Sequence, residues 1–281
     1  MLGAIVGDII GSYYEFRPWK SEDFPLFTEK SRFTDDTVMT LAVGFGVMHG
    51  YNDEESSRKA FIDNMHEIGS AYWRCGCGVR FVQWLLRKSR EPYNSFGNGS
   101  VMRVSSVAWA YQTLEDVEKF AKICAEVTHN HPEGIKGAQA TAAPIFMARQ
   151  GNNKQEIKEF IQKRYGYELS RSVEEIRKTY RFNETCQGSV PEAIICFLES
   201  INFEDAVRKA VSLGGDSYTQ AAIAGSIAEA YYREISHDIA ETALVKLDEP
   251  LINILQIWQD WLQETIVPAT SLYVPDYDFI K

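Results

Sequence analysis

The stretch Glu115-Asp-Val-Glu-Lys-Phe-Ala-Lys-Ile-Cys-Ala-Glu-Val127 repeats apolar side chains at intervals of three and four residues. Val117, Phe120 and Cys124 therefore share one face of an α-helix, as an amphipathic helix packed on a core requires. Similar spacing recurs along most of the chain, whereas the alternation typical of β-strands is rare. The best strand candidate, residues 271–274, is too short to define a sheet. The sequence predicts an all-α fold.

Helical spacing marks most of the chain. The predicted helices cover residues 3–13, 36–49, 54–69, 77–88, 100–111, 115–127, 132–150, 153–164, 172–179, 189–199, 203–212, 217–232, 237–246 and 250–264. No linker rich in Pro, Gly or Ser divides the chain, and no repeat period is visible. We therefore predict one compact multi-helix domain over residues 1–281. Residues 17–33, the longest irregular stretch, are either a lid over a site or an inert connection.

Composition and charge limit the class of protein. The formal net charge of -10 argues against direct nucleic-acid binding, because phosphate backbones are held by Lys and Arg. The N-terminal segment has no basic region and is interrupted by Asp8, so a signal peptide is not predicted. No apolar run reaches the roughly 18 residues that span a membrane. The five cysteines have neither disulfide density nor zinc spacing, so we expect reduced thiols. These features predict a cytoplasmic protein that does not associate with membranes.

Two acidic motifs precede predicted helices. Phe33-Thr-Asp-Asp-Thr37 offers a Thr N-cap and carboxylates that favour the positive end of a helix. Gly214-Gly-Asp-Ser-Tyr-Thr219 places another acidic residue at a helix start, after a tight glycine turn. Helix capping explains each motif alone. A hard-cation site is the second explanation, because both motifs offer the oxygen donors that Mg²⁺, Mn²⁺ and Ca²⁺ prefer. It requires the two motifs to meet in space.

The N-terminal helix has a pattern of its own. Gly3, Gly7 and Gly11 at four-residue spacing form a smooth helix face, and we expect another helix to pack closely against it. Asp8 lies near that face and is expected to be structural. Glu15 stands where this helix should end. By itself it is a solvated surface residue, and it gains meaning only as a further carboxylate of a site.

Two further segments are candidates for ligand binding. Gly97-Asn-Gly-Ser100 before a helix is a candidate anion cradle, because backbone N–H groups at a helix N-terminus bind phosphate. A plain turn with a Ser N-cap is the alternative. For Arg103 we favour an internal ion pair over a phosphate contact. His131-Pro132 indicates a helix start, and His129 is either a structural residue or a partner for a ring or a ribose.

Taken together, these motifs resemble those of the ADP-ribosylglycohydrolases. That family includes the dinitrogenase reductase-activating glycohydrolase and the mammalian ADP-ribosylhydrolases. The resemblance extends from residue 3 to about residue 232 and keeps the family's order, which makes a chance match improbable. Its segments are Thr34-Asp-Asp-Thr37, Gly97-Asn-Gly-Ser-Val-Met-Arg103, Thr128-His-Asn-His-Pro132, Cys186-Gln-Gly-Ser-Val-Pro-Glu-Ala193 and Gly214-Gly-Asp-Ser217.

The resemblance implies a compact all-α hydrolase with two Mg²⁺ or Mn²⁺ ions in a cleft that binds ADP-ribose. The implied metal ligands are Thr34, Asp35, Asp36, Asp216 and Thr219. The implied substrate-binding residues are Gly97, Asn98, Gly99 and Ser100 for the phosphates, with His129 beside the ADP-ribose. Glu15 matches the acidic residue that the family places near the metals. The implied catalytic residues are Glu15, Asp35 and Asp36.

One position departs from the family pattern. The family reads Gly-Gly-Asp-Ser/Thr-Asp-Thr, whereas this chain has Tyr218 in place of the second Asp, which is a metal ligand in the family. A tyrosine is neutral at pH 7, with a pKa of about 10, and it is far bulkier than Asp. Tyr218 therefore points to one bound metal instead of two, to weaker metal affinity, or to lost activity.

We expect a metal-dependent hydrolase that cleaves the glycosidic bond between ADP-ribose and a protein side chain or small leaving group, through an oxocarbenium-like state. Its partners would be ADP-ribose and ADP-ribosylated proteins or small molecules, and Glu15 would act as base or acid. Two alternatives are an ADP-ribose-binding protein without turnover and a structural protein, since the family also resembles a jellyfish lens crystallin. Tyr218 favours either alternative. The combination of Glu15 with the Asp residues of both acidic motifs favours the enzyme.

Overall fold

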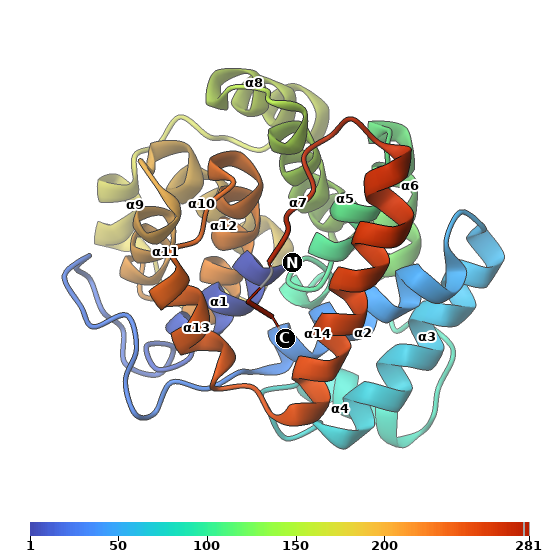
Figure 1. Cartoon of the computed structure of the whole chain (residues 1–281). Helices are drawn as coiled ribbons and strands as arrows, with labels where there is room; N and C mark the ends of the chain where they lie inside the picture. Colours follow the sequence, from blue (N-terminus) through green and yellow to red (C-terminus); the bar gives the residue numbers. More distant parts are fainter. Residues whose placement is uncertain (278, 281) are drawn as a thin grey trace.

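The computed structural model describes residues 1–277 and 279–280, and these form an all-α fold without a β-strand, as predicted (Figure 1). The α-helices are α1 (Leu2–Gly11), α2 (Asp35–Gly50), α3 (Glu54–Ala71), α4 (Val79–Leu86), α5 (Ser105–Ala110), α6 (Leu114–Glu126), α7 (Pro132–Gln150), α8 (Lys154–Tyr165), α9 (Val173–Thr179), α10 (Cys186–Glu199), α11 (Phe203–Ser212), α12 (Ser217–Tyr232), α13 (His237–Leu244) and α14 (Glu249–Trp261). The strand candidate at 271–274 is irregular. In the described part of the chain, no helix is long and apolar enough to cross a membrane.

The helix predicted over residues 100–111 is wrong in its first half. A short 3₁₀ turn, η1 (Asn98–Ser100), and further turns precede α5, which begins only at Ser105. The reason is a set of tertiary hydrogen bonds made by Asn98. The backbone N–H of Asn98 donates to Glu184 O at 2.7 Å, and its side chain donates to Ser189 and to Asp216. Contacts with distant segments therefore fix the position of η1.

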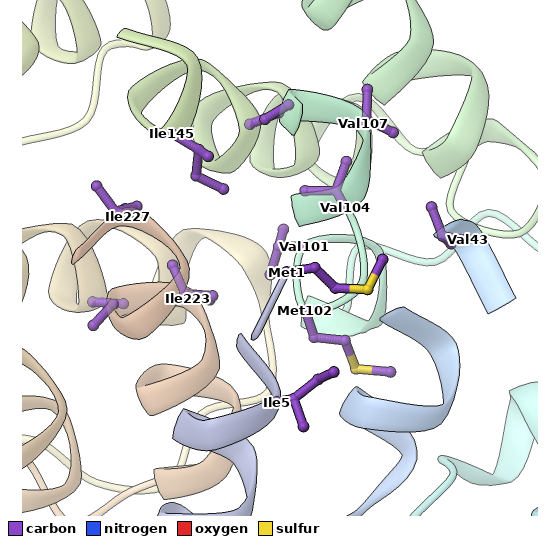
Figure 2. Packing of buried hydrophobic residues seen from close by; sticks show 14 of the residues in the cluster. Met1, Ile5, Val43, Val101, Met102, Val104, Val107, Ile145, Ile223 and Ile227 are labelled. Atoms are coloured by element: carbon purple, nitrogen blue, oxygen red, sulfur yellow. The ribbon is translucent and has the colours of Figure 1, made fainter. Parts of the chain in front are cut away.

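The apolar core lies where α1, α2, α5, α7 and α12 meet (Figure 2). Ile5, Val43, Val107, Ile145 and Ile223, one from each of these helices, are each at most 1% exposed. Packing at this density leaves little freedom for a helix to shift. The core therefore holds the beginnings of α2 and α12, the two helices that follow the acidic motifs, in a fixed relation.

The glycine face of α1 packs against α12, as predicted. A Cβ added at Gly7 would lie 2.2 Å from Ala221 O, and one added at Gly11 would lie 2.5 Å from Tyr218 Cα. No side chain fits at those separations, so the two backbones approach more closely than any other residue would permit. This contact brings the start of α12 next to the end of α1.

Gly7→Ala is therefore expected to lower the free energy of unfolding by at least about 1–3 kcal/mol, the usual cost of overpacking a core. The melting temperature should fall by several degrees, at roughly 2–4 °C per kcal/mol for a chain of this size. The control is Gly78→Ala, because no atom lies within 4 Å of a Cβ at Gly78. Equal melting temperatures for the two variants would contradict the close packing of α1 on α12.

The irregular segment 17–33 is fixed against α9 and α11. Glu22 pairs with Arg177 and, at 3.2 Å, with Lys209. The guanidinium of Arg208 donates to Glu22 O at 3.0 Å and to Phe24 O at 2.7 Å. These contacts favour a fixed connection over a mobile lid.

Candidate functional site

A cleft of about 510 Å³ lies at the beginnings of α2 and α12 and brings the two acidic motifs together. Asp35 and Asp36 come from the first turn of α2, and Asp216 immediately precedes α12. All three side chains line the cleft although their residues are at most 6% exposed. The convergence that a cation site requires is therefore present in the fold.

The three carboxylates lack enough hydrogen-bond partners. Asp35 Oδ1, Asp36 Oδ2 and Asp216 Oδ1 are buried and accept no hydrogen bond. A buried charge costs free energy unless it is paired or binds a metal. The unpartnered oxygens supply the hard donors that a divalent cation such as Mg²⁺ or Mn²⁺ prefers. Within the described residues, however, no three His, Cys, Asp or Glu side chains are gathered tightly enough to hold an ion as they stand.

Burial, together with repulsion by neighbouring carboxylates, weakens the acidity of these groups. Burial, followed by the charge of Asp8, raises the pKa of Asp35 to about 7. Burial and the carboxylates of Asp8 and Asp35 raise the pKa of Asp36 well above its ordinary value. Burial raises the pKa of Asp216 to about 6, against the hydrogen bond from Asn98. A bound cation would reverse these shifts, because it favours the charged form of each carboxyl.

Asp8 organises the first acidic motif. Its carboxylate accepts from Thr34 N at 2.9 Å, Thr34 Oγ1 at 2.7 Å and Thr37 N at 3.2 Å, and also from Thr37 Oγ1. Thr34 in turn caps α2, since its Oγ1 accepts from Asp36 N at 3.2 Å. Asp8 is therefore structural, as expected. It holds the loop that presents Asp35 to the cleft.

Asp216 occupies the N-cap position of α12 but makes no capping hydrogen bond. Its Oδ2 instead accepts from Asn98 Nδ2 at 2.7 Å. Capping therefore explains the position of Thr34 and does not explain that of Asp216. Thr219, one turn into α12, donates to Asp36 Oδ1 at 3.4 Å and so connects the second acidic motif to the first.

Glu15 and Tyr218 lie at the edge of the carboxylate cluster. Both are partly buried and line the cleft. Burial, and then the charges of Asp216 and Asp35, raise the pKa of Glu15 to about 8. Burial and the same carboxylates also raise the pKa of Tyr218, so its phenol stays neutral. Tyr218 therefore adds bulk to the cluster without charge.

The loop at 97–100 has used part of its hydrogen-bonding capacity. Gly97 N donates to Ser95 Oγ at 3.1 Å, and Asn98 N pairs with Glu184 O. Ser100 is fully buried behind the loop, with its hydroxyl donating to Gly134 O at 3.0 Å. Gly97, Asn98 and Gly99 line the cleft, and Ser100 does not. The loop therefore contacts the cleft through its glycines and Asn98.

His129 lies directly behind the two glycines. Its Nε2 is 3.2 Å from the position of a Cβ on Gly99, and its Nδ1 shares a hydrogen bond of 2.8 Å with Thr128 Oγ1. Burial and the charges of Arg103 and Arg80 lower the pKa of His129 well below its usual range. The ring is therefore neutral at physiological pH and keeps both hydrogen-bonding roles.

The prediction of an ion pair for Arg103 is wrong. No carboxylate of the described residues pairs with it, and its Nη2 donates to Thr128 Oγ1 at 2.7 Å and to Cys124 O at 3.3 Å. Arg103 lines the cleft, is 1% exposed, and has an unpartnered Nε. A buried cation without a counter-ion makes this end of the cleft favourable for an anion.

Other cleft residues had no recognisable signal in the sequence. The turn at Gly76 lies against Asp35, because a Cβ there would lie 2.5 Å from Asp35 Oδ1 and its φ of +138° suits glycine alone. The thiols of Cys75 and Cys77, on either side of this glycine, are free, as expected for reduced cysteines. The sequence assigned no role to the other lining residues, which are Phe16, Met39, Gly78, Val79, Arg80, Phe81, Tyr93, Ser95, Met102, Phe182 and Glu184.

Similarity to known proteins extends over most of this chain. The family model for ADP-ribosylglycohydrolase matches residues 1–271. ADP-ribosylhydrolase ARH3 of Homo sapiens is 27% identical over 83% of this chain and 84% of that protein. The putative ADP-ribosyl glycohydrolase L543 of Acanthamoeba polyphaga mimivirus is 25% identical over 93% and 96%, respectively. A solved structure titled ADP-ribosylglycohydrolase-related protein complex has a TM-score of 0.61 at 22% identity, covering 87% of this chain and 95% of that one, which shows a shared fold.

Proposed function

Because this chain belongs to the ADP-ribosylglycohydrolase family, we propose that it hydrolyses the glycosidic bond between ADP-ribose and a protein side chain or small leaving group, with a bound divalent cation. The observation that carries this proposal is the set of buried carboxylates with unpartnered oxygens in one cleft. A site that only bound ADP-ribose, itself an anion, would be weakened by such carboxylates unless a cation neutralised them.

The proposed cation is Mg²⁺ or Mn²⁺. The residues that would hold it and that line the cleft are Asp35, Asp36, Asp216 and Thr219. Thr34 is the fifth ligand that the resemblance implies, and its hydroxyl already donates to Asp8 and caps α2. When bound, such a cation polarises substrate oxygens and makes water more acidic. The resemblance implies two ions, and Tyr218 reduces the number of charged donors, so we propose that one or two bind here.

The remaining groups bind the substrate and move a proton. Gly97, Asn98 and Gly99 border the phosphates, and the uncompensated charge of Arg103 attracts them through the wall of the cleft. Neutral His129 offers Nε2 to a ribose hydroxyl. Glu15 holds the proton that is exchanged with the reacting groups, because its carboxyl lies at the edge of the cluster and has a raised pKa.

An ADP-ribose-binding protein without turnover is the second candidate, and Tyr218 is the observation that favours it. A neutral, bulky side chain occupies the position of a family ligand, inside the cleft and among the carboxylates. Calorimetry with ADP-ribose, with and without Mg²⁺, separates a binder from a structural protein of the same fold.

Tyr218→Asp is expected to raise the rate of ADP-ribose release by about tenfold or more, because it restores a charged oxygen donor and frees space in the cluster. The measurement is a release assay with Arg-, Ser- and O-acetyl-linked ADP-ribose, with and without Mg²⁺, on the native protein and on the variant. The native protein should show weak, Mg²⁺-dependent release.

The matched control for this prediction is Tyr218→Asn, which frees the same space without adding a charge. Only the Asp variant should gain Mg²⁺-dependent release. If neither the native protein nor Tyr218→Asp releases ADP-ribose from any of the three linkages, the hydrolase proposal fails for those linkages. An equal gain in both variants would show that bulk, and not charge, limits the native site.

A further inference from the structure

A second hollow of about 810 Å³ adjoins the cleft on the side of Glu15. Glu15 and Phe182 border both spaces, so the hollow continues the cleft beyond the carboxylate cluster. It runs between the irregular segment after α1, the end of α9 and the glycine turn before α12. We call this hollow the side groove.

The side groove carries a cluster of positive charge on a protein of net charge -10. Lys20 Nζ donates to Tyr180 O at 2.9 Å, and Arg181 Nη1 donates to the same oxygen at 2.8 Å. Two cations therefore meet at one carbonyl. No carboxylate of the described residues lies within ion-pair distance of either.

Two further cations, Arg177 and Lys178, line the side groove together with Glu174. Arg177 is compensated, because it pairs with Glu22 and, at 3.1 Å, with Glu174. Lys178 has only a loose contact of 3.4 Å with the same Glu174, and its side chain is 66% exposed. Burial, and then the charges of Arg181 and Arg177, lower the pKa of Lys20. Cations held close together repel one another, and an anion that binds between them relieves this repulsion. Such a group of cations therefore favours the binding of an anion.

The position of the side groove indicates which part of a substrate it contacts. The loop at 97–99 and His129 border the cleft as proposed for ADP-ribose, and Glu15 is the proposed proton-transfer group. The side groove begins at Glu15 and therefore faces the leaving group that is attached to the ribose. It also faces the part of the substrate to which the leaving group belongs.

The distribution of charge favours an acidic peptide over a nucleic acid. A nucleic acid needs a long track of cations, because each phosphate along the strand carries a charge. Here the cations of the side groove form a short cluster and not a long track, and the net charge of the whole protein repels a long polyanion. A short acidic segment places its charge within the groove and extends no further.

On the basis of the proposed function, we propose that the side groove binds acidic residues flanking the ADP-ribosylated side chain, so that the preferred substrates are proteins modified within acidic segments. Lys20, Lys178 and Arg181 provide the cations. Guanidinium and ammonium groups both bind carboxylates, and exposed pairs of this kind affect association more than they affect folding. Phe182, which is 53% exposed and borders both the cleft and the side groove, contacts the backbone of the bound substrate peptide where it passes from one to the other.

The test compares ADP-ribosylated peptides of one linkage whose flanking residues are Glu, Gln or Lys, using both Ser- and Arg-linked sets. Dissociation constants are measured by fluorescence anisotropy at low salt, and turnover is measured separately. We expect the Glu-flanked peptide to bind about tenfold more tightly than the Gln-flanked one, which corresponds to about 1.4 kcal/mol. The preference should decline at high salt, because exposed charges are screened.

The variant is Lys178→Glu with Arg181→Glu, and the milder form changes both residues to Gln. In the double Glu variant, the preference for the Glu-flanked over the Gln-flanked peptide should disappear or invert. In the double Gln variant, it should decrease. The control is Lys59→Glu with Lys163→Glu, which changes net charge equally at exposed positions of α3 and α8. It should keep the full preference.

Two results would overturn the side-groove proposal. The first is that the native protein binds the Glu-flanked and Gln-flanked peptides with equal dissociation constants. A preference for the Glu-flanked peptide that disappears in the control variant as fully as in the groove variant would count equally. The second is an ADP-ribosylated single-stranded oligonucleotide that binds the native protein more tightly than the acidic peptide and loses this affinity in the groove variant. If the binding preference follows the groove charges and no peptide is cleaved, the side groove is supported and the hydrolase proposal fails.

Discussion

Asp36→Asn is expected to lower ADP-ribose release by about 10³-fold and, at the same time, to raise the melting temperature of the metal-free protein. A bound cation contributes several kcal/mol to catalysis, and each 1.36 kcal/mol is a factor of ten in rate. Without the cation, burial and the repulsion of neighbouring carboxylates raise the pKa of Asp36 well above its ordinary value, so folding must either bury a charge with an unpartnered oxygen or protonate it, and both cost free energy. An amide removes that repulsion and still accepts from Thr219, so a gain of about 2 °C or more is expected.

The contrasting variant is Asp8→Asn, the same chemical change beside the same cluster. Asp8 accepts hydrogen bonds from the backbone and the hydroxyl of both Thr34 and Thr37. An amide group cannot accept on its nitrogen, so buried donors would lose their partner and the melting temperature should fall. Thermal unfolding with and without Mg²⁺ measures both variants. If Asp36→Asn keeps its activity, or melts below the native protein, the cluster is structural and the cation proposal is wrong.

The opposite behaviour expected for two neighbouring aspartates shows what sequence reasoning can reach. Both belong to an acidic, helix-associated pattern, and the sequence correctly indicated that Asp8 is structural. For Asp216 the residues alone favoured capping, with cation binding as the alternative, because the choice depends on where the carboxylate points. In the structure that carboxylate accepts from Asn98 and makes no capping hydrogen bond to α12. Such a contact across 118 residues has no local signature.

The helical fold itself was largely predictable, because amphipathic spacing records which face of each helix is buried. The exception is the region from η1 to α5, where tertiary hydrogen bonds fix the backbone and override the helical pattern. The prediction of an ion pair for Arg103 was wrong for a related reason. A buried arginine suggests a carboxylate partner, but here Thr128 Oγ1 and a backbone carbonyl take that place. Long-range partners of this kind can be read only from the folded chain.

Glu15→Gln is expected to reduce ADP-ribose release by about 10²–10⁴-fold, the usual contribution of a positioned acid or base. The side chain is partly buried at the edge of the cleft, and no hydrogen bond of the described residues depends on its carboxylate. Gln keeps its shape and removes a carboxyl whose raised pKa costs folding free energy near neutral pH, so the melting temperature should not fall below that of the native protein. The control is Glu29→Gln, an exposed position in the irregular segment. It should leave the rate unchanged.

The loss of rate in Glu15→Gln, compared between substrates with different leaving groups, shows which proton Glu15 transfers. If it donates to the departing oxygen, the loss should be greatest for Ser-linked ADP-ribose, because an alkoxide leaves poorly without a proton. An O-acetyl group departs as a stabilised carboxylate and should lose much less. If Glu15 instead takes a proton from the attacking water, the loss should be similar for both linkages. Retention of more than half of the native rate on every linkage would remove Glu15 from the reaction. The acid–base chemistry would then belong to the aspartate cluster.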